Sequence, residues 1–244
     1  MSGADFFHRV PAIGAKAPTL LEQVLALTSW ELLFIVSPDN VIEAGTGVSQ
    51  LTDLSGNNAH ALQGTDANRP SLATGSNGAS VLTFNGTSDY LEGTLANTLD
   101  SDDGVEVFCA TSGGADIQDA YFDAEPTNSL TNQGLLFYRG TAGVATLRCQ
   151  GDQNAEGTTS LDDWVVVHGR NEITDRRVYV NGVEEGQNTV SRGGTLQYFR
   201  IGSLFQNVYF LNADVAFFGF VSGGILSDSV RAEIAALLVA EYVP

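Results

Sequence analysis

The feature that most constrains this chain is Leu161–Gly186, LDDWVVVHGRNEITDRRVYVNGVEEG, in which strand-like runs flank an Asn-Gly pair. Asn181-Gly182 separates the alternating run that ends at Val180 from Val183. Both residues of the pair tolerate positive φ, and the type I′ turn that they form matches the twist of paired strands. The segment therefore predicts three antiparallel strands with turns at Asn171–Asp175 and Asn181-Gly182. We expect the rest of the chain to pack against this meander.

Size and charge narrow the class of protein. The chain has 244 residues, 43% of them hydrophobic, which is enough for one large β-sandwich or two small domains. It contains no apolar run of the roughly 18 residues that cross a membrane, so we expect no membrane insertion. The N-terminus has no basic segment followed by an apolar one, so we expect no signal peptide and synthesis in a host cytoplasm. The net charge of −18 would repel phosphate backbones, which argues against nucleic-acid binding.

The first 29 residues differ from the rest. They carry two acids and two bases, so the whole net charge belongs to residues 30–244. Pro18–Ser29 has the apolar spacing of a short amphipathic helix, and it follows an arm without a clear period. We therefore divide the chain into an arm and helix (1–29) that anchor or oligomerise the protein and a globular domain (30–244). The predicted anchoring residues are Phe6, Phe7, Arg9, Leu21, Val24 and Leu25.

Several further segments predict elements of this domain. Ser227–Tyr242 predicts a closing helix, because Ser227 is a good N-cap and apolar residues recur on one face from Val230 to Leu238. Apolar or alternating runs between Gly- and Asn-rich turns predict the other strands. These runs are Leu32–Val36, Ser80–Phe84, Val105–Cys109, Ala120–Phe122, Leu135–Arg139, Val144–Cys149, Tyr198–Gly202 and Asp214–Val221.

Several short motifs follow one another along the chain in an order that resembles that of a known family of domains. An Asp-x-Ser-Gly-Asn turn (Asp53–Ala61) is followed by Arg69-Pro70, by the strand-turn-strand Phe84–Leu91 and by the Tyr-Val-Asn-Gly hairpin. This order is similar to that of concanavalin A-like (laminin-G-like) jelly-roll domains, which occur in bacterial surface proteins and in bacteriophage tail and capsid proteins. The resemblance covers about residues 30–243. It implies an all-β fold in which two antiparallel sheets form a jelly-roll sandwich, with the arm and short helix before it and a helix after it.

Catalytic patterns are missing from the sequence. Some members of this family are glycosidases, whose paired carboxylates on one strand face would follow a Glu-x-Asp-x-Glu pattern, and no such run is present. The pairs Asp162-Asp163 and Glu184-Glu185 are adjacent, so their side chains diverge. No Gly-x-Ser-x-Gly elbow or zinc-ligand spacing occurs, and His60 and His168 are typical of structural histidines. We therefore predict a protein that is not an enzyme.

Two kinds of ligand remain open. Some jelly-roll proteins bind calcium through loop carboxylates, and Asp100, Asp102 and Asp103 form such a loop, with a plain polar loop as the alternative. From this resemblance we expect no cofactor other than calcium. A sugar would need exposed aromatic side chains, and the candidates are Tyr121, Tyr138, Tyr198 and Tyr209, with burial in the core as the alternative. Cys109 and Cys149 would be buried thiols, or a disulfide if their strands are neighbours.

These features lead to a main hypothesis of a structural virion protein, either a capsid decoration or a tail-associated protein. Its arm would bind other virion proteins, and its lectin-like domain would face outward. The resemblance to particle proteins implies a homo-oligomer, with a trimer as one form. The alternative is a carbohydrate-binding adhesin that recognises a host surface glycan, and a glycan hydrolase is the third option.

Overall fold

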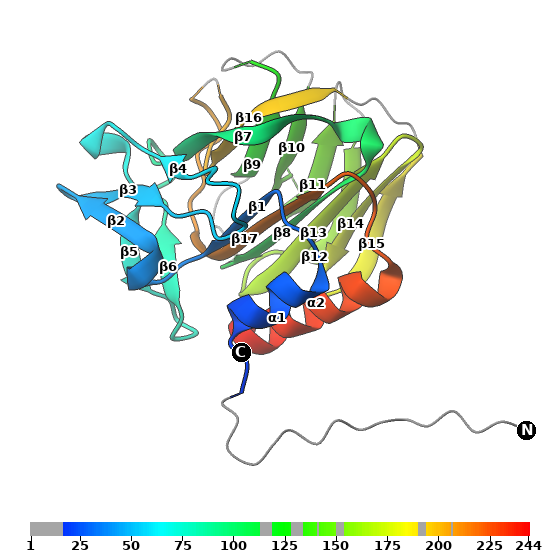
Figure 1. The fold of residues 1–244 in the computed structure, drawn as a ribbon, viewed down its shortest axis with the longest axis horizontal. Helices are drawn as coiled ribbons and strands as arrows, with labels where there is room; N and C mark the ends of the chain where they lie inside the picture. Colours follow the sequence, from blue (N-terminus) through cyan, green and yellow to red (C-terminus); the bar gives the residue numbers. More distant parts are fainter. Residues whose placement is uncertain are drawn as a thin grey trace, which may run out of the picture.

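The computed structural model describes residues 17–112, 119–127, 134–140, 142–149, 154–189, 194–205 and 207–244, apart from the side chain of Cys149. The described strands form two antiparallel sheets that stack as a sandwich (Figure 1), which confirms the predicted fold class. Sheet A contains eight described strands in the order β15-β14-β13-β8-β17-β6-β5, with β1 also paired to β17. Sheet B contains nine in the order β12-β11-β10-β9-β16-β7-β4-β3-β2.

The bounds of the elements are as follows. Sheet A consists of β1 (Leu32–Ile35), β5 (Ser71–Thr74), β6 (Ser80–Thr83), β8 (Val105–Thr111), β13 (Val165–Glu172), β14 (Asp175–Val180), β15 (Val183–Asn188) and β17 (Asp214–Ser222). Sheet B consists of β2 (Val41–Ala44), β3 (Gly47–Leu51), β4 (Ala61–Leu62), β7 (Leu91–Asp100), β9 (Ala120–Glu125), β10 (Leu135–Arg139), β11 (Val144–Cys149), β12 (Asn154–Ser160) and β16 (Thr195–Ile201). The helices are α1 (Leu20–Leu27) and α2 (Asp228–Tyr242), and short 3₁₀ turns lie at Pro38–Asn40, Asp66–Asn68 and Ser101–Asp103.

The Asn-Gly meander forms as predicted, but it lies at one edge of sheet A. Asn181 and Gly182 have φ of 50° and 82°, which the type I′ turn requires. The preceding turn is shorter than Asn171–Asp175, because Asn171 pairs with Arg176 inside the ladder. The strands at the centre of the sheet are β8 and β17. Strands β8, β11 and β12 and the helix α2 contact the meander as predicted, but the meander is not the centre against which the whole chain packs.

The strands β8 and β17 are buried on both faces, which explains why their residues are mostly apolar. One face of each points into the core between the sheets, where Phe218 and Phe220 contact Phe122 of β9. The other face points toward the helices and carries Phe108 and Phe217. Sheet A is thus covered on both sides, by sheet B and by α1 and α2.

The two helices lie side by side on the outer face of sheet A (Figure 1). Thr19 and Glu22 cap the start of α1 reciprocally, and Ser227 caps α2. Trp30 donates from Nε1 to the carbonyl of Val24, and the side chain of Val24 is fully buried in the cluster shared with α2. The described part of residues 1–29 therefore shares a core with residues 30–244.

The Asp-x-Ser-Gly-Asn turn has a structural explanation. The carboxylate of Asp53 accepts hydrogen bonds from the backbone N–H groups of Leu33, Ser55 and Ala59, and Nδ1 of His60 accepts from the N–H of Asp53. One buried carboxylate thereby ties this loop to β1, and the structural role predicted for His60 is confirmed.

Candidate functional site

A row of three rings crosses the outer face of sheet A. Phe108 on β8, His168 on β13 and Tyr179 on β14 are cross-strand neighbours. The ring of His168 stacks 4.1 Å from that of Phe108 and 4.7 Å from that of Tyr179, measured between centroids. The helix α2 covers the Phe108 end of the row. Tyr179, at the other end of the row, lies between α2 and the hairpin that joins β14 to β15.

A buried carboxylate joins α2 to this row. Glu106 on β8 is 0% exposed. Its Oε2 accepts from Nε2 of His168 at 2.7 Å and from Nε of Arg231 at 2.9 Å. Its Oε1 accepts from the N–H of Leu226 at 2.8 Å and from Nη2 of Arg231 at 3.1 Å. Because Arg231 lies in the first turn of α2, these bonds fix the start of the helix on sheet A.

The charges of this cluster follow from its burial. Burial alone would raise the pKa of Glu106, but the hydrogen bonds from His168 and Arg231 outweigh it and hold the pKa at about 2. Burial lowers the pKa of His168 below its usual value despite the bond to Glu106. At neutral pH we therefore assign an ionised Glu106, a charged Arg231 and a neutral His168 that donates from Nε2.

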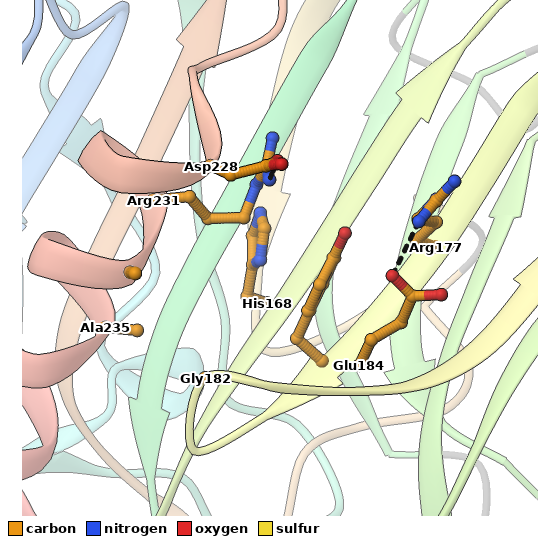
Figure 2. A pocket seen from close by; sticks show the side chains of 9 residues that line it. His168, Arg177, Gly182, Glu184, Asp228, Arg231 and Ala235 are labelled. Carbon is orange, nitrogen blue, oxygen red and sulfur yellow. Dashed lines mark hydrogen bonds and ion pairs between the residues drawn. The ribbon is translucent and has the colours of Figure 1, made fainter.

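A pocket of about 220 Å³ opens between α2 and the β14–β15 hairpin. Figure 2 shows Asp228 and Arg231 reaching in from α2, with Arg177 and Glu184 on the strands opposite. Tyr179 also lines the pocket. We call this cavity the helix–hairpin pocket, and it is lined by His168, Arg177, Tyr179, Gly182, Glu184, Asp228, Arg231, Ala232 and Ala235.

The charged groups of the helix–hairpin pocket are held in pairs. Arg177 donates from Nη1 to Glu184 at 2.6 Å and from Nε to Asp175 at 2.7 Å. Arg231 donates from Nη1 to Asp228 at 2.7 Å. The four charged lining residues therefore balance to zero. Asp175 and the buried Glu106, which accept from the same two arginines, add two negative charges behind the lining, so the site has no excess of positive charge. A site with positioned donors and acceptors and an aromatic side chain, but no unmatched cation, is suited to a neutral, polyhydroxylated ligand.

The predicted sugar-binding tyrosines lie elsewhere and do not form one group. Tyr121 is 1% exposed in the core between the sheets, so it cannot contact a sugar. Tyr138 and Tyr198 are half-buried on sheet B. Tyr209 is 43% exposed, and its φ of 55° is unusual for an aromatic residue. Tyr198, with Glu92, Gly93, Thr94 and Phe205, lines a smaller pocket of about 130 Å³.

Sheet B also contains a carboxyl pair that the sequence patterns missed. Asp123 and Glu125 are alternate residues of β9 and are 1% and 3% exposed. Burial, and then the charge of Glu125, raise the pKa of Asp123 to about 8, although the N–H of Phe205 and the charge of Arg200 oppose this rise. The Glu-x-Asp-x-Glu pattern does not detect this pair, because Asp123-Ala124-Glu125 contains only two of its three carboxylates. Because both carboxyl groups are almost fully buried, neither is placed to reach a polysaccharide.

The remaining predicted site residues are scattered. Asp100 caps the 3₁₀ turn by accepting from the N–H of Asp102, and the described residues contain no group of three or more His, Cys, Asp or Glu that could hold a metal. Cys109 is a free, buried thiol on sheet A, whereas Cys149 lies on sheet B. Of the anchoring residues, Val24 is buried and Leu25 exposed, and the predicted arm residues Phe6, Phe7 and Arg9 lie outside the described residues.

Comparisons with known proteins find the same fold in several solved structures. No protein-family model and no curated protein matches the sequence. Among solved structures, a botulinum neurotoxin type C chain, from work on cell entry that depends on two ganglioside molecules, aligns with a TM-score of 0.63 and 11% identity over 87% of this chain and 52% of that one. The binding domain of Paraclostridial Mosquitocidal Protein 1 aligns at 0.62 and 13%, over 89% and 53%.

A catalytic protein also shares the fold. The Trypanosoma rangeli sialidase in complex with the inhibitor DANA aligns with a TM-score of 0.58 and 15% identity over 93% of this chain and 34% of that one. This chain therefore spans about half the length of the toxin chains and a third of the sialidase. At these identities the likeness shows the jelly-roll-like sandwich alone.

The helix–hairpin pocket was not foreseen from the sequence. His168 and Glu184 were interpreted separately as a sheet histidine and a turn carboxylate, and Arg231 had no assigned role. The pocket is assembled from β13, β14, β15 and α2, and its lining residues lie up to 67 positions apart in the sequence, from His168 to Ala235. The Asn-Gly turn was the one local signal close to it.

Among the described residues, no helix is both long and apolar enough to cross a membrane.

Proposed function

We propose that this protein is a non-enzymatic, lectin-like domain that binds a neutral sugar in the helix–hairpin pocket. The observation that carries the proposal is the charge-balanced set of paired side chains around Tyr179. Side chains already held by ion pairs lose little conformational freedom when a ligand binds. An anionic sugar would bring its charge to a pocket in which Arg177 and Arg231 are each already bonded to two carboxylates.

Sugar binding by another protein with this fold gives independent but weaker support for the proposal. Structures with this sandwich include a botulinum neurotoxin serotype D ligand-binding domain in complex with N-acetylneuraminic acid. That sugar is anionic, so the charge balance of the helix–hairpin pocket predicts a different preference for this chain.

Isothermal titration calorimetry with a panel of neutral and sialylated oligosaccharides tests the proposal. We expect saturable binding to a neutral sugar and a loss of about tenfold or more in affinity in Arg177→Met, because hydrogen bonds to charged groups are worth about 1.5–3 kcal/mol. The side chain of Arg177 is 29% exposed, so this variant should fold. Tyr198→Ala, on the opposite sheet, is the matched control and should bind like the native protein.

Two other outcomes would contradict the proposal. If binding survives in Arg177→Met but disappears in Tyr198→Ala, the sugar site lies on sheet B and the helix–hairpin pocket is not the site. If no oligosaccharide or host polysaccharide binds at millimolar concentration, the lectin-like function is wrong.

We also propose, as a second function, that the domain is displayed on a virion as a capsid or tail component attached through residues 1–16. The arm has one acid and two bases, whereas the rest of the chain carries a net charge of −19, and this contrast favours separate roles for the two parts. Mass spectrometry of purified particles tests this role, and absence of the protein from them would exclude it.

A further inference from the structure

An apolar groove lies where α1 and the end of α2 meet the edge of sheet A. Its volume is about 410 Å³, within the range of small-ligand pockets. One side is lined by the start of α1, through Thr19, Leu20 and Leu21, and another by the end of α2, through Glu241 and Tyr242. The floor comes from the end of β1 and the segment after it, from the loop after β3 and from the β5–β6 hairpin, through Ile35, Val36, Ser37, Asn40, Leu54, Ala79 and Ser80. We call it the α1 groove.

The α1 groove is an open side of the second hydrophobic core. Leu20, Leu21, Ile35 and Leu54 are partly buried residues that pack against the cluster under the two helices. Each leaves part of its apolar surface in the groove. Covering such surface contributes about 25 cal/mol for each Å², so an apolar segment within reach would be held there.

The segment within reach is the arm. Residues 1–16 join the described chain two residues before Thr19, at the rim of the groove. Ile13 is six residues before Thr19, a distance of at most about 20 Å for extended chain. Gly14 permits the reversal that would bring Ile13 and Val10 back over the rim. The apolar residues of the arm are Phe6, Phe7, Val10 and Ile13.

The charges of arm and domain are complementary. The arm includes Arg9 and Lys16, which is the only lysine of the chain, and the remaining residues carry a net charge of −19. Glu241 lies at the rim of the groove and is exposed. Opposite charges across the rim, together with a tether of a few residues, raise the effective concentration of the arm at the groove.

From these observations we infer that residues 1–16 of the same chain dock in the α1 groove through their apolar side chains. The occupied groove keeps the arm on its own domain, so a partner that uses the arm must displace it first. The inference does not depend on the sugar-binding or virion roles. A second copy of the chain and a different protein are the alternative occupants.

Methyl NMR of the full chain, labelled at Ile, Leu and Val, tests the inference. A variant with Phe6, Phe7, Val10 and Ile13 all replaced by Ser is compared with the native chain at several concentrations. We expect the methyl signals of Leu20, Leu21, Ile35 and Leu54 to shift in the variant. The signals of Val183 and Val239, which line a separate groove beside α2, should stay in place. Ser2→Ala in the arm is the matched control and should shift none of them.

A change on the groove side makes the test reciprocal. Ala79→Trp fills the α1 groove, so the backbone amides of residues 12–16 should exchange faster in this variant than in the native chain. Unchanged groove methyl signals in the four-serine variant would overturn the inference. Shifts that develop only as the native chain is concentrated would overturn it too, because the occupant would then be the arm of a second copy.

Discussion

The change Glu106→Gln should destabilise the protein more than any other conservative change near the helix–hairpin pocket. Glu106 is fully buried and accepts four hydrogen bonds, from His168, Leu226 and twice from Arg231. The substitution removes the negative charge and places an N–H₂ group against these donors. Breaking a buried ion pair from one side costs about 3–5 kcal/mol, because the other charge stays buried.

The pKa of Glu106 gives a second value for the same effect. Its displacement from 4.5 to about 2 corresponds to roughly 3 kcal/mol of preference for the ionised form in the folded state. For a chain of this length, a loss of 3 kcal/mol lowers the melting temperature by roughly 6–12 °C.

The effect should also depend on pH in a defined direction. Because the folded pKa of Glu106 is depressed, its contribution is complete above the unfolded value near 4.5 and disappears as the pH falls toward 2. The lowered pKa of His168 also destabilises the folded state in acid, but it does so in the native protein and in the variant alike. The stability difference between native protein and Glu106→Gln should therefore shrink in acid.

Urea unfolding followed by tryptophan fluorescence, at pH 7 and at pH 3, measures these differences. Asp228→Asn is the control, because Asp228 is also bonded to Arg231 but its side chain is 97% exposed, so the change should cost less than about 1 kcal/mol. Adding Arg231→Met to Glu106→Gln should recover part of the loss, since apolar side chains can replace a buried pair. A loss of less than about 1 kcal/mol in Glu106→Gln at pH 7 would refute this account of how α2 is held.

Three further predictions concern the sheets. Gly202→Ala should cost more than about 2 kcal/mol in urea unfolding, because Gly202 has φ of 90° and an added Cβ would lie 2.4 Å from the ring of Phe84. Asp123→Asn should become more stable relative to the native protein as the pH rises from about 4 to 8, because over this range the native carboxyl, with a pKa of about 8 beside Glu125, is ionised in the unfolded chain but held neutral in the folded one. An equal stability difference between the two proteins at pH 4 and pH 8 would contradict this. Cys109, whose pKa is raised by burial, should react with a thiol reagent only after unfolding, as peptide mapping of the labelled protein would show.

Local signals in the sequence were sufficient for most elements. The strands Leu135–Arg139 and Val144–Cys149 have the predicted ends, and α2 begins after the predicted cap Ser227. The strand Asn154–Ser160 was missed because its sequence, NAEGTTS, is polar and does not alternate. Its place is decided by pairing with β11, through contacts that a single segment does not reveal.

The class of fold follows from signals that each act over a few residues, namely the period of two along the strands, the positive-φ turn at Asn181-Gly182 and the caps of the helices. The positions of the candidate sites depend instead on contacts between segments that are distant in the sequence. Glu106, His168 and Arg231 belong to β8, β13 and α2, and they meet because sheet order and helix packing bring distant segments together. Local propensity does not specify such long-range pairings, and the burial that sets the charges of this cluster exists only once the whole sandwich has formed.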